Sequence, residues 1–217
     1  MSLKDTHILL IQPLVGIGDM LWHKPWIENL SKNNKITLLA KPTTKSGTFF
    51  KKNKNIKIIN LERSMRGKTA QHDGVLGFIK LIKLFKLINP KIAMILHHSF
   101  RYAAACKISG IQKIYGYGFG SQKFLVNCGE ILPNYLKNQH AIDRIHFFSK
   151  QNGFGMENPI WSIDLTAKQK KLGTKFLYNN NLIKNKTIVP FLIIGVGAMN
   201  KERQWGATKF SNLIKLL

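Results

Sequence analysis

Short apolar runs that alternate with helical patterns constrain the fold of this 217-residue sequence more than any other feature. The first run, residues 7–12, is almost continuously apolar, and it is followed by a glycine-containing turn at residues 15–19 and a helical pattern at residues 20–30. An apolar run of this length is typical of a parallel strand that is buried on both faces. Further strands are predicted at residues 35–39, 55–60, 92–96 and 113–117.

The segments between these strands have the periodicity of helices. Residues 75–88 place apolar side chains on one face and lysines three positions apart on the other, which predicts an amphipathic helix that ends at Asn89-Pro90. Pro25 lies inside the first helical pattern, so we expect a kink or a later helix start there. Further helices are predicted at residues 101–108, 138–150 and 166–178. Strands that alternate with helices predict an α/β fold with a Rossmann-like, doubly wound parallel sheet.

The predicted domain organisation is one complete domain followed by the start of another. Residues 1–160 are expected to form a Rossmann-like domain, and residues 161–186 are expected to connect it to the next. Residues 187–217 then begin a second Rossmann-like domain with a strand at residues 187–194 and a helix at residues 207–217. A single strand and helix cannot bury both faces of the strand, so the sequence predicts an incomplete second domain.

The charge balance is strongly basic, with 34 Lys+Arg against 10 Asp+Glu and a formal net charge of +24. Such a surface attracts phosphates, nucleic acid or anionic lipid head groups. Lysine dominates over arginine, and asparagine and isoleucine are abundant, so the bias of an AT-rich genome explains the same composition; both explanations stay open. A nucleic-acid-binding module is disfavoured, because the aromatic residues are scattered and form no stacking platform.

The cysteines and the apolar segments indicate a cytoplasmic protein. Cys106 and Cys128 are widely spaced and form no C-x-x-C motif, so neither a disulfide framework nor a zinc site is indicated. The N-terminus lacks the long apolar region of a signal peptide, and the apolar run at residues 188–199 is too short to cross a bilayer. Peripheral attachment to the cytoplasmic face of the inner membrane remains open.

His97 and His98 are the most obvious candidates for metal ligands. Neighbouring residues at the end of a strand point to opposite faces, and no third ligand is apparent in the sequence. We therefore expect no metal site.

The glycine turn at residues 16–19 could suggest a dinucleotide-binding loop. The third glycine of that motif would fall at position 21, which is Leu21, and no acidic residue follows the second predicted strand. The turn instead presents the carboxylate of Asp19 at a helix N-terminus, beside two residues without side chains, Gly16 and Gly18. Two interpretations stay open: an aspartate that only caps the helix, and a carboxylate that takes part in chemistry.

Five motifs in the same order resemble those of the ADP-heptose:lipopolysaccharide heptosyltransferases, which form glycosyltransferase family 9. They are Gly16-Ile-Gly-Asp-Met-Leu-Trp-His-Lys-Pro25, His98-Ser-Phe-Arg101-Tyr-Ala, Gly110-Ile111 with Ile114-Tyr-Gly-Tyr117, Gln139-His140-Ala-Ile-Asp-Arg144, and Gly195-Val-Gly197-Ala198 with Arg203-Gln-Trp205. The resemblance implies a GT-B-like fold, in which two Rossmann-like domains face each other across a cleft. The acceptor then binds the N-terminal domain and the nucleotide sugar binds the C-terminal domain.

By this resemblance, each candidate site residue has an expected role. Asp19 matches the general base that takes the proton from the acceptor hydroxyl. The donor diphosphate is expected near Gly197, Ala198, Lys201 and Arg203. The acceptor is expected near Gly16, Gly18, Arg63, Arg66 and Arg101. Arg63 and Arg66 could bind an acidic acceptor group, such as a Kdo carboxylate or a lipid A phosphate, although a solvated basic loop explains them equally well.

The implied activity is inverting, metal-independent transfer of a heptose or related sugar from an ADP-sugar, probably ADP-heptose in the sense that the family uses it, to a lipopolysaccharide core or related bacterial glycan, with no cofactor. The sequence departs from the family pattern in two places. The turn at residues 195–197 lacks the usual proline, and the family's downstream Asp-[Ser/Thr]-Gly-x-x-His segment has no counterpart. We therefore expect this chain alone to be inactive. The alternative is a non-catalytic, truncated remnant that binds acidic glycolipid.

Overall fold

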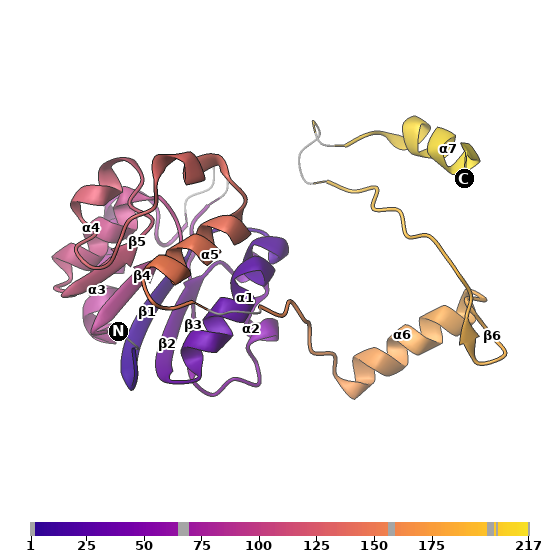
Figure 1. Ribbon diagram of the computed structural model, residues 1–217, viewed down its shortest axis with the longest axis horizontal. Helices are drawn as coiled ribbons and strands as arrows, with labels where there is room; N and C mark the ends of the chain where they lie inside the picture. The colour runs from indigo at the N-terminus through magenta and orange to yellow at the C-terminus, as the bar shows by residue number, and fades with distance from the viewer. Residues whose placement is uncertain (1–2, 65–69, 156–158, 199–201, 203, 217) are drawn as a thin grey trace. The chain divides into compact units, whose positions relative to one another are not determined.

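The computed structural model describes residues 3–64, 70–155, 159–198, 202 and 204–216. The chain divides into two compact units, Met1–Ile163 and Asp164–Leu217 (Figure 1). Each unit is described by itself. Within the described residues, no helix combines the length and the apolar character that crossing a bilayer requires.

A five-stranded parallel sheet forms the centre of the first unit. Its strands are β1 (Thr6–Gln12), β2 (Asn34–Ala40), β3 (Ile56–Asn60), β4 (Ile92–Ile95) and β5 (Lys113–Gly116). They are arranged in the order β3-β2-β1-β4-β5, with Ile8 of β1 paired to Ile36 on one side and Ile92 on the other. The chain winds outward in both directions from β1, so the predicted doubly wound α/β fold is confirmed. In such sheets ligands bind beyond the carboxyl ends of the strands, where the winding direction reverses.

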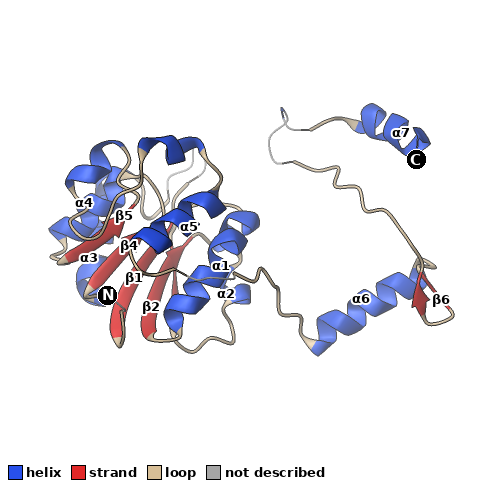
Figure 2. Ribbon diagram, in the orientation of Figure 1, coloured by secondary structure: helices blue, strands red, loops and turns tan. Residues whose placement is uncertain are grey.

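Helices cover both faces of this sheet (Figure 2). The helices of this unit are α1 (Ile17–Ser31), α2 (Ser46–Phe49), α3 (Gly74–Ile88), α4 (Phe100–Ile108) and α5 (Ala141–Gln151). Ile8 and Leu10 of β1 pack in one core with side chains of α1 and α5, whereas Leu9 and Ile11 pack in a second core with side chains of α3 and α4. Successive strand residues thus point to opposite faces, which explains the continuous apolar run.

The helix boundaries differ from the prediction at two places. The helix α1 begins at Ile17 and continues through Pro25 to Ser31, so the predicted later start is wrong. The carboxylate of Asp19 caps the helix from its third position and fixes the start upstream of the proline. The segment predicted as one helix at residues 138–150 is a 3-10 turn, η3 (Asn134–Asn138), followed by α5, whose first turn is capped by His140.

The second unit contains two helices and a short hairpin. Its elements are α6 (Ala167–Asn179), β6 (Ile183–Lys184), β7 (Thr187–Ile188) and α7 (Ala207–Leu216). The predicted strand at residues 187–194 is wrong beyond its first two residues: β7 pairs antiparallel with β6, and residues 189–198 have no regular secondary structure. A strand needs a neighbour for its backbone hydrogen bonds. Among the described residues, the two-residue strand β6 is the only such neighbour of β7.

Candidate functional site

The turn that joins β1 to α1 holds Asp19 at the carboxyl edge of the sheet. The backbone N–H of Gly16 donates to Oδ2 of Asp19 at 2.8 Å, so the carboxylate caps the helix that it belongs to. Asp19 is half-buried, and this hydrogen bond uses one of its two oxygens. The capping interpretation is therefore confirmed. It does not exclude chemistry, because a capped carboxylate is held in place and keeps its second oxygen for another contact.

The two glycines of the turn have different structural roles. A Cβ atom added to Gly16 would lie 2.9 Å from Oδ2 of Asp19, which is closer than such atoms approach. A Cβ atom added to Gly18 would meet only Trp22, at 3.9 Å, which is an ordinary contact. Gly16 is thus required for the position of the carboxylate, whereas Gly18 leaves an exposed opening beside it.

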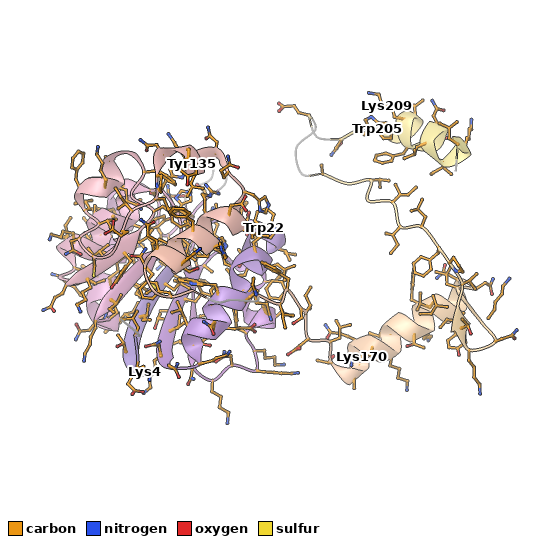
Figure 3. All side chains as sticks on the ribbon, in the orientation of Figure 1. Lys4, Trp22, Tyr135, Lys170, Trp205 and Lys209 are labelled. Atoms are coloured by element: carbon orange, nitrogen blue, oxygen red, sulfur yellow. The ribbon has the colours of Figure 1, made fainter. Side chains whose placement is uncertain are left out.

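A small polar cavity lies at the same edge of the sheet. Its volume is about 80 Å³, and it is lined by Leu14, His23, Leu96, His97, His98, Tyr117 and Arg144. This volume holds a few water molecules or one small polar group of a ligand. Figure 3 shows Tyr135, in the turn η3, at this end of the unit and Lys4, just before β1, at the opposite end.

His23 connects the cavity to Asp19. It is buried, and its Nδ1 lies 2.6 Å from the backbone carbonyl oxygen of Asp19, so Nδ1–H donates to that oxygen. Burial lowers the pKa of His23 to about 4, and the neutral ring therefore predominates at neutral pH. The proton on Nδ1 leaves Nε2 as an acceptor. This atom is buried and has no hydrogen-bond partner among the described residues.

Tyr117 and Arg144 contribute donors to the cavity. The hydroxyl of Tyr117 and Nε of Arg144 are buried, and neither has a hydrogen-bond partner among the described residues. Burial raises the pKa of the Tyr117 hydroxyl, so it stays protonated and can donate. The Arg144 guanidinium lies 5.9 Å from the centre of the Tyr117 ring. An acceptor atom and two donors around one cavity can bind a hydroxyl or carboxylate group of a ligand.

These three residues were not predicted as site residues from the sequence. His23 and Tyr117 lie inside the motifs that resemble family 9, and Arg144 ends another of them. Arginine in a chain dominated by lysine was the one signal for Arg144. His23 and Tyr117 gave no separate signal, because a histidine in a helix and a tyrosine after a strand are common in protein cores.

The relationship between His97 and His98 differs from the prediction. Their rings stack, with centroids 4.2 Å apart and planes 24° from parallel, so the expectation that they point to opposite faces is wrong. The strand β4 ends at Ile95, and the alternation of a strand no longer applies two residues later. Burial lowers the pKa of His97 to about 4, and the neighbouring cations His98, Arg144, Arg63 and Lys41 lower it further.

Two of the predicted acceptor residues, Arg63 and Arg101, meet at the start of α3. Nε of Arg63 donates to Oδ1 of Asp73 at 3.1 Å. Arg101 donates through Nη2 to the carbonyl oxygens of His72, at 3.0 Å, and Gly74, at 2.7 Å. Hydrogen bonds from Ser64 and from Arg63 hold the pKa of Asp73 well below its usual range. Arg63 is therefore an ordered residue and not part of a freely solvated loop.

The other predicted site residues are in the second unit or outside the described residues. Gly197 and Ala198 lie in the segment without regular structure, where the carbonyl of Ala198 accepts from the side chain of Gln204 at 2.7 Å. Arg66, Lys201 and Arg203 lie outside the described residues. The donor and acceptor candidates therefore remain two separate sets.

Comparison with known proteins identifies a class of fold. No family model matches the sequence, and no curated protein does. Among solved structures, a family 9 glycosyltransferase from Veillonella parvula DSM 2008 matches with a TM-score of 0.69 and 18% identity, over 100% of this chain and 60% of that protein. The E. coli heptosyltransferase WaaC with ADP matches with a TM-score of 0.56 and 16% identity, over 97% of this chain and 64% of that protein.

A third solved structure gives the same result. The E. coli ADP-heptose lipopolysaccharide heptosyltransferase II matches with a TM-score of 0.54 and 15% identity, over 82% of this chain and 51% of that protein. The chain thus has the GT-B-like, Rossmann-type fold of these glycosyltransferases, and it spans less than two thirds of the length of each. The structural resemblance to family 9 confirms the one inferred from the five motifs.

Proposed function

We propose that this chain supplies the acceptor-binding domain of a family 9 glycosyltransferase. The protein transfers a heptose or related sugar from an ADP-sugar to a lipopolysaccharide core or related glycan at the cytoplasmic face of the inner membrane. The main support is the half-buried carboxylate of Asp19 at the start of α1, at the ligand-binding edge of a sheet with the fold of heptosyltransferases.

Asp19 is the general base in the proposed reaction. An acceptor hydroxyl attacks the anomeric carbon of the donor sugar as the bond from that carbon to the diphosphate breaks, and the configuration at the carbon is inverted. The carboxylate takes the proton of the hydroxyl as the new bond forms. Its hydrogen bond to Gly16 N–H fixes one oxygen, so the other is available at a defined position.

The cavity beside Asp19 is proposed to orient the acceptor. His23, Tyr117 and Arg144 present an acceptor atom and two donors that lack partners among the described residues. An acidic sugar, such as Kdo, carries both hydroxyls and a carboxylate, and a guanidinium binds a carboxylate through charge-assisted hydrogen bonds. Arg63 and Arg101 add positive charge at the same edge of the sheet, next to the N-terminus of α3.

The donor diphosphate is proposed to bind the segment that contains Gly197, Ala198, Lys201 and Arg203. A departing diphosphate is stabilised by cations and by backbone N–H groups. The support for this role is the similarity of residues 195–205 to the donor-site motif of the family.

Calorimetric titration of the chain with an acidic Kdo-containing glycan and with a neutral glycan of the same size tests acceptor binding. We expect the acidic glycan to bind about tenfold or more tightly, because one charge-assisted contact contributes on the order of 1.5–3 kcal/mol. Arg144→Gln should remove this preference. Lys150→Gln, an exposed position on the same helix α5, is the matched control and should preserve it.

Equal binding of the two glycans would contradict the proposed acceptor site. A parallel titration with an ADP-sugar separates the enzyme from a non-catalytic remnant, because micromolar donor affinity contradicts the remnant.

A further inference from the structure

The helix α3 has an outer face on which apolar side chains and lysines are mixed. The apolar members Val75, Leu76, Ile79 and Leu87 are 76%, 75%, 42% and 84% exposed. The lysines Lys80, Lys83 and Lys86 are also exposed. At 3.6 residues per turn, these seven positions fall within an arc of about 140°. We call these seven side chains the outer face of α3.

The rest of α3 anchors it firmly to the sheet. Leu81 and Phe85 on the inner side are completely buried in the core beneath it. Gly77 packs so closely against the backbone of His72 that an added Cβ atom would lie 2.2 Å from its carbonyl carbon. The outer face is therefore a rigid surface and not one side of a loosely attached helix.

The charge of this face has a single sign. The 15 residues of α3 include three lysines and no acidic residue. Lysine is depleted in protein–protein interfaces, since its flexible ammonium group is costly to desolvate. At a lipid surface, by contrast, the alkyl stems of lysines lie against apolar groups while their ammonium groups reach anionic phosphates. The mixture therefore fits an anionic lipid surface better than a protein partner.

The position of α3 relates this face to the candidate acceptor site. The helix follows β3, so Val75 and Leu76 at its start lie at the carboxyl edge of the sheet. Arg101 donates to the carbonyl oxygen of Gly74, which is the first residue of the helix. The exposed apolar side chains and a predicted acceptor residue are thus next to one another in this unit.

We propose that the outer face of α3 docks the protein on an anionic membrane surface, with Val75, Leu76 and Ile79 entering the interfacial region and the lysines contacting lipid phosphates. This role extends the proposed function, because a glycolipid acceptor is anchored in that same surface. Its test uses neither donor nor acceptor, so the two proposals can fail separately.

The test is co-flotation of the 217-residue chain with phosphatidylcholine vesicles, with and without phosphatidylglycerol. We expect binding to the vesicles that contain phosphatidylglycerol and much weaker binding to those that lack it. The triple variant Lys80→Gln, Lys83→Gln, Lys86→Gln should bind on the order of 100-fold less, since each lysine near an anionic surface contributes about a fivefold gain. All three positions are exposed, so thermal unfolding should be unchanged.

The matched charge control is Lys32→Gln, Lys51→Gln, Lys54→Gln. These exposed lysines precede β2 and β3, at the amino edge of the sheet, and the substitutions remove the same net charge. The control should lose far less binding than the α3 triple variant. Equal losses in the two variants would overturn the proposal, because net charge alone would then explain binding.

The apolar contribution is tested with Val75→Ser combined with Leu76→Ser. We expect about tenfold weaker binding, since each of these side chains leaves water on docking. The control is Leu172→Ser with Phe176→Ser on α6, where the apolar side chains are also exposed. Unchanged binding of the α3 variant, absence of vesicle binding by the unmodified chain, or a change of oligomeric state caused by the α3 substitutions would each overturn the proposal; the last would assign the face to a second copy of this chain.

Discussion

Nδ1 of His23 donates to the backbone carbonyl oxygen of Asp19 at 2.6 Å, one turn apart on α1. The residue that supplies the proposed base is therefore bonded directly to a residue that lines the polar cavity. Because Nδ1 carries the proton, Nε2 is an acceptor at this site. The base and the group proposed to orient the acceptor are thus positioned by the same turn of helix.

The burial of His23 predicts a pH dependence of stability. Its pKa is lowered from 6.5 to about 4 in the folded protein, so between these values the unfolded chain binds the proton and the folded chain does not. Stability is therefore complete above pH 6.5 and is lost as the pH falls towards 4. We expect His23 to account for a loss of about 2 kcal/mol between pH 7 and pH 5.

Urea unfolding of His23→Gln at these two pH values measures this contribution. The difference between the two free energies of unfolding should shrink by about 2 kcal/mol in the variant. His146→Gln, at an exposed position on α5, should keep the full difference. An unaltered pH dependence in His23→Gln would show that the ring is solvated.

The two glycines of the turn should respond in opposite directions to alanine. Gly16→Ala places a Cβ atom 2.9 Å from Oδ2 of Asp19 and should displace the cap, with a loss of about 1 kcal/mol of stability. Gly18→Ala has only a normal contact with Trp22 and lies within the helix, so it should stabilise the protein by about 0.5–1 kcal/mol. Thermal unfolding of the pair checks this, and a destabilised Gly18→Ala would show that the turn needs both glycines.

The buried hydroxyl of Tyr117 should serve ligand binding and not the stability of the fold. It has no hydrogen-bond partner among the described residues, so Tyr117→Phe removes a desolvated group without breaking a bond. We expect unchanged or slightly higher stability, by up to about 1 kcal/mol, and about tenfold weaker binding of the acidic glycan. Denaturant unfolding and calorimetry measure the two effects. A loss of stability above that size would mean that the hydroxyl already has a partner in the folded protein.

The ion pair at the start of α3 should be structural. Asp73 accepts hydrogen bonds from the N–H groups of Ser64 and Ala70, both at 3.0 Å, as well as from Arg63. Asp73→Asn keeps one acceptor oxygen and loses the charge, so we expect a loss of about 1–2 kcal/mol, measured by urea unfolding. Asp143→Asn, at an exposed position on α5, is the control and should change stability little. Equal stability of the two variants would contradict the structural role of Asp73.

The sequence predicts the sheet well because its strands are buried on both faces. Residues 7–12 and 35–39 are continuous apolar runs, and the observed strands β1 and β2 extend them by one or two residues. The start of α1 could not be predicted in the same way, because Gly16 offers no side chain as a cap and the contact with Asp19 depends on the backbone. The short strand β7 shows the limit of local pattern: residues 189–194 are apolar, yet a strand also needs a partner.

The candidate site could be predicted only in part. Asp19 stands out because a carboxylate after a glycine turn at the end of a strand is recognisable in the sequence. The cavity combines residues from positions 14 to 144, which the order of strands in the sheet brings together. The stacking of His97 on His98 depends on the backbone after β4, which residue types do not determine.

Sugar transfer by the complete gene product, compared between the unmodified protein and Asp19→Asn, tests the central claim most directly. Asparagine keeps an oxygen for Gly16 N–H, so the fold and the glycan affinity should be retained. The account predicts that the rate of transfer from an ADP-sugar to an acidic glycan falls by a factor on the order of 100 or more. A variant that transfers sugar at the unmodified rate would contradict it.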